Sequence, residues 1–131
     1  MSGRNWLIVG AVLGGLGVVC GAFGAHLLEE RELVPPERLE TWEIAVRYQL
    51  VHALALVLVG VLQWQGPRGA WLSAAGWCFT LGVLLFSGLL YTLALSGISM
   101  LGAIVPLGGL AMIAGWVALA VGAARLAGPP Q

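Results

Sequence analysis

Four long apolar runs, separated by short polar segments, constrain the fold of this chain more than any other feature. They cover residues 6–28, 43–63, 71–95 and 106–126. Each run is long enough to span a membrane, because about 20 apolar residues cross the hydrocarbon core of a bilayer as a helix. The chain is 60% hydrophobic and only 9% charged, whereas about 25% of the residues in a soluble domain are charged. The sequence therefore predicts an integral membrane protein, with residues 1–131 as a single membrane domain.

The connections predict how these helices follow one another. The first connection, "EERELVPPERLETWE", contains all six acidic residues of the chain. Pro is favoured at the first position of a helix, so we expect the second helix to begin near Pro36. Pro106 should open the fourth helix in the same way, and a longer helix kinked at Pro106 is the alternative. The expected fold is an all-α, four-helix transmembrane bundle with up-down topology and one acidic, amphipathic connection between its first two helices.

The N-terminal run exceeds the apolar core of about 7–15 residues that a signal peptide has, so we expect it to be retained as the first span. Arginine lies on both sides of the expected membrane: Arg4, Arg68 and Arg125 beside the termini, and Arg31, Arg38 and Arg47 beside the acids. If Arg47 faces the membrane, three arginines stand against two. This excess favours cytoplasmic termini, because cytoplasmic segments carry more positive residues.

Glycine recurs along one face of the first span and, with alanine, along one face of the fourth. The spacings alternate between three and four residues, which places these positions on one side of a helix. Small residues let two helix backbones approach closely in lipid. The expected helix-packing glycines are Gly10, Gly14, Gly17, Gly21, Gly24, Gly108, Gly115 and Gly122. Since the first and last helices of an up-down bundle are neighbours, we expect the two rows to meet. Contact with a second subunit is the alternative.

Polar side chains enter the apolar interior at the start of the second run, "RYQLVHALAL". His52 lies about 13 Å beyond Glu43 along the helix axis. Gln49 and His52 must both find partners, because the bilayer core supplies no water. Ionisable residues at such depth are often functional. Arg47 lies one turn from Glu43, which predicts an i,i+4 ion pair at the membrane edge or an arginine extended toward the surface.

We expect these groups to converge with others on a small polar pocket in the outer half of the bundle. Its expected members are His26, Gln49, His52, Ser87 and Tyr91. On the first hypothesis the pocket binds a small lipid, a quinone-like molecule or a partner helix. On the second, the protein is a structural or accessory subunit of a membrane complex, and the same groups form hydrogen bonds between its helices. An oligomeric channel or carrier is the third.

The sequence lacks the residues that several other functions require. His26 and His52 lie at different depths, and no cysteine or carboxylate completes a ligand set, so we expect no metal, haem or other cofactor. Every glutamate belongs to the first connection, so no span contains the membrane-embedded carboxylate that a proton-coupled exporter needs. The chain has no Asp, no GxSxG motif and no phosphate loop, and we expect it not to be an enzyme. Without Lys it has no basic patch for nucleic acid.

Four blocks of the sequence also carry a family resemblance. They are "GAFGAH" (21–26), "TWEIAVRYQLVHALAL" (41–56), "FSGLLYTLAL" (86–95) and "PLGGLAMIAGW" (106–116). In this order they resemble the YgdD-like family, small four-span membrane proteins of unknown function found in bacteria. The resemblance implies a multi-pass protein of the bacterial inner (plasma) membrane, and it implies no activity. Its motif positions here are His26, Tyr48, Gln49, His52, Ser87, Tyr91, Pro106, Gly108 and Gly109, and Leu27 departs from the glycine that often follows the first block.

Overall fold

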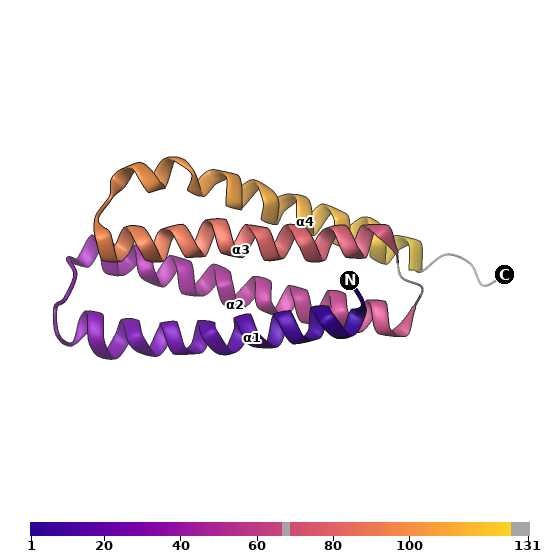
Figure 1. The fold of residues 1–131 in the computed structure, drawn as a ribbon, viewed down its shortest axis with the longest axis horizontal. Coiled ribbons are helices and arrows are strands. Elements are labelled where there is room, and N and C mark those ends of the chain that lie inside the picture. The colour runs from indigo at the N-terminus through magenta and orange to yellow at the C-terminus, as the bar shows by residue number, and fades with distance from the viewer. Residues whose placement is uncertain (67–68, 127–131) are drawn as a thin grey trace.

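A computed structural model describes residues 1–66 and 69–126, where the chain forms four long helices and two short helical segments (Figure 1). The long helices are α1 (Gly3–Phe23), α2 (Pro36–Gln65), α3 (Ala70–Ser96) and α4 (Val105–Leu126). The π-helical η1 (Gly24–Glu29) continues α1, and the 3₁₀-helical η2 (Ser99–Ala103) precedes α4. All four long helices are apolar and long enough to cross a membrane. This confirms the predicted all-α, four-span class.

Consecutive helices run in opposite directions, so that α1 begins and α4 ends at the same end of the molecule (Figure 1). Pro36 is the first residue of α2, as the sequence predicts. Pro106 lies in the first turn of α4 and opens this helix, with η2 as a separate segment before it. Arg68, one of the three arginines that favour cytoplasmic termini, lies outside the described residues.

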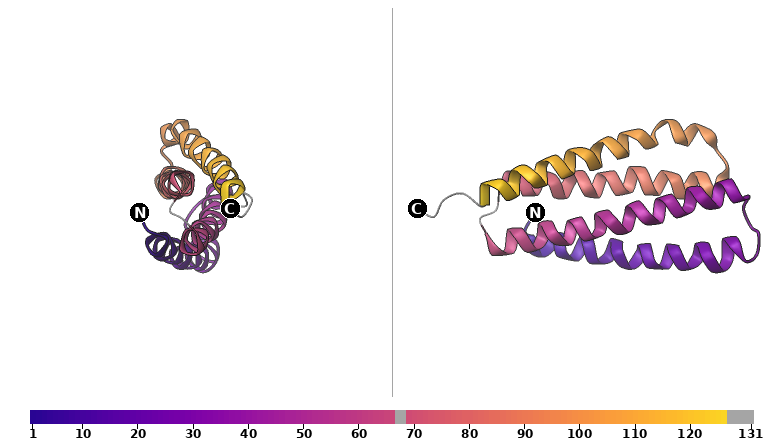
Figure 2. Two further views of the ribbon diagram at one scale, coloured as in Figure 1. Left: turned by 90° about the vertical axis from the view of Figure 1, so that its right-hand side faces the viewer. Right: turned by 180° about the vertical axis from the view of Figure 1, so that it is seen from behind.

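The helices form an open, curved row in chain order rather than a closed ring (Figure 2). Extensive contacts join α1 to α2, α2 to α3 and α3 to α4, and a smaller contact joins α2 to α4. Half of the residues in the most apolar stretch of α2 are buried, against 17% in α1. Helix α2 is therefore the central helix of the row, and α1 is its edge.

The two glycine rows do not meet each other, and this expectation is wrong. A Cβ added at Gly10 in α1 would lie 2.8 Å from the Ala53 carbonyl oxygen in α2. A Cβ added at Gly108 in α4 would lie 2.5 Å from the Phe86 backbone nitrogen in α3. Each row is covered by the helix next to it in the chain, because the short connections dock neighbouring helices as antiparallel pairs.

The expected glycines differ in how closely a neighbouring helix approaches them. An added Cβ would come within 2.5–2.8 Å of the adjoining helix at Gly10, Gly17, Gly24, Gly108, Gly115 and Gly122. At Gly14 and Gly21 the nearest atoms would be 3.8 and 3.5 Å away, which is ordinary van der Waals contact. Six of the eight positions therefore set the distance between helices, and two do not.

Replacement of Gly108 by alanine tests this packing. The new methyl group would press on the backbone of α3, which cannot move aside as a side chain can. We expect Gly108→Ala to lower the free energy of unfolding by about 1–3 kcal/mol, the usual cost of overpacking. Thermal unfolding in a mild detergent measures the change.

Gly88→Ala is the matched control, since a Cβ at Gly88 would meet nothing within 4 Å. This variant should unfold at the same temperature as the parent or slightly higher, because alanine favours helix. Equal destabilisation by the two variants would show that close approach at Gly108 is unimportant.

Candidate functional site

Helix α2 carries two polar side chains that are buried inside the molecule. Gln49 and His52 are each 4% exposed, although they lie in an apolar helix. Ser87 in α3 is 1% exposed, and Tyr91 lies one turn further along α3. We call Gln49, His52, Ser87 and Tyr91 the polar core. All four were expected to lie together, and the structure gives each a partner on a neighbouring helix.

Gln49 connects three helices through its amide group. Its Nε2 donates to the Leu13 carbonyl oxygen in α1 over 2.8 Å. Its Oε1 accepts from the Tyr91 hydroxyl in α3, also over 2.8 Å. The two partners fix the orientation of the amide, because a carbonyl can only accept and the Tyr91 hydroxyl needs an acceptor. Gln49 therefore holds α1 and α3 against α2 at one depth.

His52 connects α2 to α4. Its Nδ1 lies 2.7 Å from the Tyr48 carbonyl oxygen, one turn earlier in α2. Its Nε2 lies 3.2 Å from Nε1 of Trp116 in α4. A carbonyl oxygen only accepts and an indole N–H only donates, so Nδ1 carries the proton and Nε2 is the acceptor. This arrangement requires a neutral imidazole, which suits a residue inside the bilayer.

Two further side chains fasten the neighbouring helices to α2. The Ser87 hydroxyl in α3 donates to the Ala45 carbonyl oxygen over 2.8 Å. Nε1 of Trp42 in α2 donates to the Cys20 carbonyl oxygen in α1 over 2.9 Å. The Trp42 ring also packs on Tyr91, with ring centroids 4.5 Å apart. The side chains of the polar core thus form hydrogen bonds between helices, and aromatic rings pack beside them.

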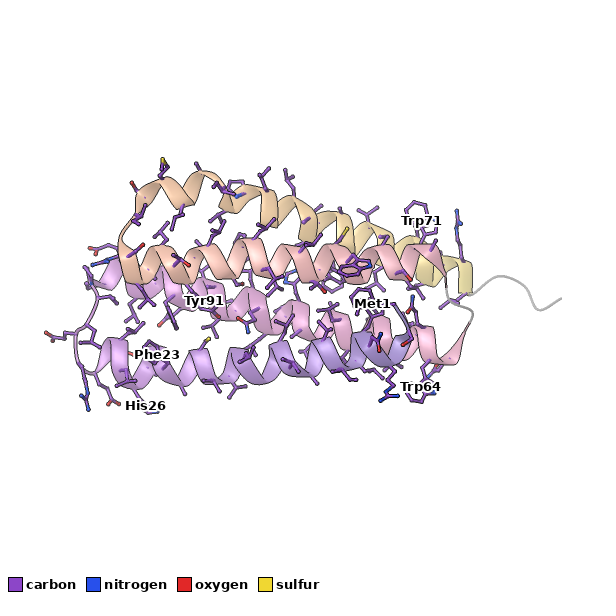
Figure 3. The ribbon with its side chains drawn as sticks, in the orientation of Figure 1. Met1, Phe23, His26, Trp64, Trp71 and Tyr91 are labelled. Atoms are coloured by element: carbon purple, nitrogen blue, oxygen red, sulfur yellow. The ribbon has the colours of Figure 1, made fainter. Side chains whose placement is uncertain are left out.

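His26 does not join the polar core, and its expected place there is wrong. Its imidazole is exposed, and Nδ1 lies 3.0 Å from the Glu30 carboxylate. Figure 3 shows His26 on the outer side of its helix, away from Tyr91. His26 lies in the π-helical segment η1, whose wider turn shifts side chains from the faces that a regular α-helix gives them.

The expected ion pair between Arg47 and Glu43 does not form in the structure. Among the described residues, the one ion pair joins His26 and Glu30. Arg47 and Glu43 are both exposed. The interpretation of Arg47 as an arginine extended toward the membrane surface stays a prediction.

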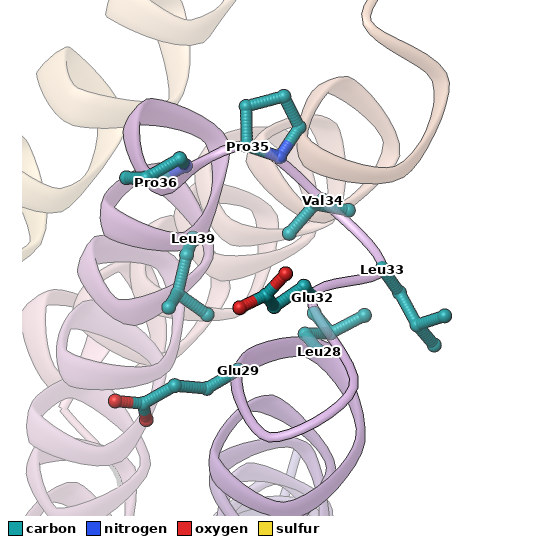
Figure 4. Close-up of a pocket in the computed structure, with 8 residues that line it drawn as sticks. All are labelled: Leu28, Glu29, Glu32, Leu33, Val34, Pro35, Pro36 and Leu39. Atoms are coloured by element: carbon teal, nitrogen blue, oxygen red, sulfur yellow. The ribbon is translucent and has the colours of Figure 1, made fainter.

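Five cavities of the described chain are lined by residues outside the polar core. One of about 720 Å³ lies at the connection between η1 and α2, where Glu29, Glu32 and the side chain of Leu39 line it (Figure 4). None of the four polar-core residues lines this cavity. Within residues 1–66 and 69–126, no group of three or more His, Cys, Asp or Glu side chains could hold a metal ion.

Trp116 and two backbone carbonyls are parts of the site that sequence reasoning missed. Trp116 ends the apolar stretch "IAGW", and the only polar group of its side chain is the indole N–H. An indole N–H inside a bilayer needs an acceptor from the protein, because lipid supplies none, so Trp116 could have been predicted as a partner of His52. The carbonyls of Leu13 and Ala45 carry no sequence signal, because every residue has one.

These contacts define the protein as a four-span, all-helical membrane protein with hydrogen bonds between its helices. Residues 20–109 match the model of a family described as "Protein of unknown function (DUF423)", and the chain belongs to this family. A UPF0382 membrane protein of Staphylococcus haemolyticus is 43% identical over 95% of this chain and 99% of its own length. The UPF0382 membrane protein YwdK of Bacillus subtilis is 42% identical over 93% of this chain and 98% of its own.

The matches agree with the expected membrane family of unknown function, but the matched names do not confirm the name YgdD-like. No solved structure matches the chain significantly. Since the relatives are named as bacterial membrane proteins and four apolar helices are present, the lipid bilayer is the environment of this protein.

Removal of the Tyr91 hydroxyl tests the bond that joins α2 to α3. Tyr91→Phe leaves the Gln49 Oε1 without its donor in a site that lipid cannot satisfy. We expect a loss of about 0.5–2 kcal/mol in unfolding free energy, the range of single hydrogen bonds between membrane helices. Chemical unfolding in detergent micelles measures it.

Tyr48→Phe provides the control for the loss of a phenol hydroxyl. Tyr48 is 42% exposed, and its hydroxyl makes no hydrogen bond within the described residues. This variant should match the parent. If Tyr91→Phe is equally silent, the Gln49–Tyr91 bond does not stabilise the fold.

Proposed function

We propose that the protein is a non-enzymatic, structural component of the bacterial inner membrane, with the role of an accessory subunit and with both termini in the cytoplasm. The observation that carries the proposal is that every polar-core side chain has a protein partner. In this role the hydrogen bonds of the polar core hold the four membrane-spanning helices together. The relatives' names, which state membrane location and no activity, agree with such a role.

A ligand site at the polar core is the weaker hypothesis, because the groups that would bind a ligand are engaged. Gln49 uses both ends of its amide, and His52 uses both ring nitrogens. A quinone or a lipid headgroup would have to break a bond between two helices in order to bind there. Breaking such a bond in the bilayer costs free energy that the ligand must return.

The edge position of α1 supports the accessory role. Only one side of this helix is covered by α2, and its outer face exposes apolar side chains, among them Ile8, Val12 and Val19. Such a face is suited to lie against lipid or against the apolar helix of a neighbouring membrane protein. Helix α1 therefore has room for a partner, whereas the polar core does not.

A pair of variants distinguishes a brace from a ligand site. Trp116→Phe alone leaves Nε2 of His52 as an unpaired acceptor and should cost about 0.5–2 kcal/mol of stability. The double variant His52→Leu/Trp116→Phe removes donor and acceptor together and should recover most of this loss, since replacing both partners by apolar groups is nearly neutral. Melting temperatures of the purified proteins provide the comparison.

The same proteins are then heated with a short-chain benzoquinone. On the structural hypothesis the quinone leaves the melting temperature of the parent unchanged. A rise of several degrees in the parent that the double variant abolishes would instead establish the polar core as a binding site.

A further inference from the structure

A groove follows the outside of the α1–α2 pair, on the surface that faces the bilayer. Its deep part has a volume of about 450 Å³ and an apolar wall that includes Gly14, Gly15, Val18, Leu54 and Val57. A second part of about 360 Å³ adjoins it toward the membrane surface. Leu50 lines both parts, and its side chain packs against Gly17, so the two parts lie end to end along the helix pair with Leu50 at their junction.

The floor of the deep part is open because two glycines lie there without close neighbours. A Cβ added at Gly15 would meet nothing within 4 Å, and one at Gly14 would meet only the Ala53 Cβ at 3.8 Å. Gly10 and Gly17 in the same helix are different, because the adjoining helix leaves no room for a side chain there. Glycine weakens a helix relative to alanine. Internal packing therefore explains Gly10 and Gly17 but not Gly14 and Gly15.

The outer part of the groove ends at two charged side chains, Arg47 and Glu43. Both are exposed, and neither has an ion-pair partner among the described residues. Arg47 and Val57 are ten residues apart on α2, or about 15 Å along the axis. This is about half the thickness of the hydrocarbon core, the depth that the acyl chains of one leaflet fill. The long side chain of Arg47 can extend from there toward the phosphate groups, as arginine does near membrane interfaces, and Glu43 lies one turn further out.

The occupant must be apolar over this depth, anionic at Arg47 and cationic beyond it at Glu43. A helix with its side chains is about 10–12 Å wide, so a 15 Å length of it takes up roughly 1,000 Å³ or more. The deep part, at about 450 Å³, accepts one extended hydrocarbon chain rather than a helix. Phosphate is an anion that the guanidinium of arginine binds well.

We propose that this groove is a binding site for one phospholipid whose headgroup carries an amine. The acyl chain lies over Gly14 and Gly15, the phosphate contacts Arg47, and the amine contacts Glu43. The site is separate from the polar core and uses none of its residues. A lipid held in this way covers the open side of the α1–α2 pair.

Native mass spectrometry of the full chain, released from bilayers of equal phosphatidylethanolamine and phosphatidylglycerol with matched acyl chains, tests the proposal. We expect the parent to retain one phosphatidylethanolamine per chain, in preference to phosphatidylglycerol. Gly15→Leu, which fills the groove, and Arg47→Gln, which removes the phosphate contact at an exposed position, should each reduce this retention at least fivefold. Glu43→Gln should remove the preference for phosphatidylethanolamine.

Gly88→Leu is the control, because it adds the same side chain at another open glycine that does not line the groove. It should retain the lipid as the parent does. The proposal is overturned if the parent retains no lipid, if it retains both lipids equally, or if the groove variants retain as much as the control. The proposal is also overturned if the parent is a dimer and Gly15→Leu makes it monomeric. That result would assign the groove to a second copy of the chain.

Discussion

A polar group inside a bilayer has no water to bond with, so it must find its partner within the protein. This constraint explains why α2 is the central helix of the row. Gln49 and His52 enter the bilayer on α2, and each neighbouring helix brings a partner to it. Helix α1 brings the Leu13 carbonyl, α3 brings the Tyr91 hydroxyl, and α4 brings the Trp116 indole. A helix that rotated about its own axis would leave one of these groups unpaired.

The hydrogen bonds and the glycines have separate effects on the packing. The glycines set how near two helices come, because an added Cβ at Gly10 or Gly108 would lie within 3 Å of the next backbone. The bonds of the polar core set the rotation of each helix. In lipid there is little hydrophobic drive between helices, so close packing and hydrogen bonds have to stabilise the fold together. The proposed lipid groove follows from the same division, since it lies where glycine is present but no helix covers it.

The sequence predicts the helices well because their signals are local. Length and hydropathy define the four spans, and Pro36 and Pro106 mark where α2 and α4 begin. The depth of Gln49 and His52 also follows from simple counting along α2. The order of helix contacts does not follow, because a row of small residues such as that of α1 fits any neighbour of suitable shape. Nothing in the sequence indicates that α2 covers the row of α1 and that α3 covers the row of α4. The two rows could equally have packed against each other.

The members of the polar core could be predicted only in part, for a similar reason. Gln49, His52, Ser87 and Tyr91 are polar residues in apolar helices, so their need for partners is visible in the sequence. The rotation of each helix, which decides the pairing, is not. The π-helical segment η1 turned His26 away from its expected place, and Trp116 was missed because its indole was counted among the apolar residues. Arg47 and Glu43 have the spacing of an ion pair but lie apart.

The state of His52 is the most direct test of this account. Solid-state nitrogen NMR of the histidine-labelled protein in lipid bilayers resolves the two ring nitrogens of His52 from those of the exposed His26. The account predicts a neutral His52 ring with its proton on Nδ1 and with Nε2 coupled through a hydrogen bond to the indole N–H of Trp116. A proton on Nε2, a charged ring, or loss of this coupling would contradict the claim that the polar core holds the helices together.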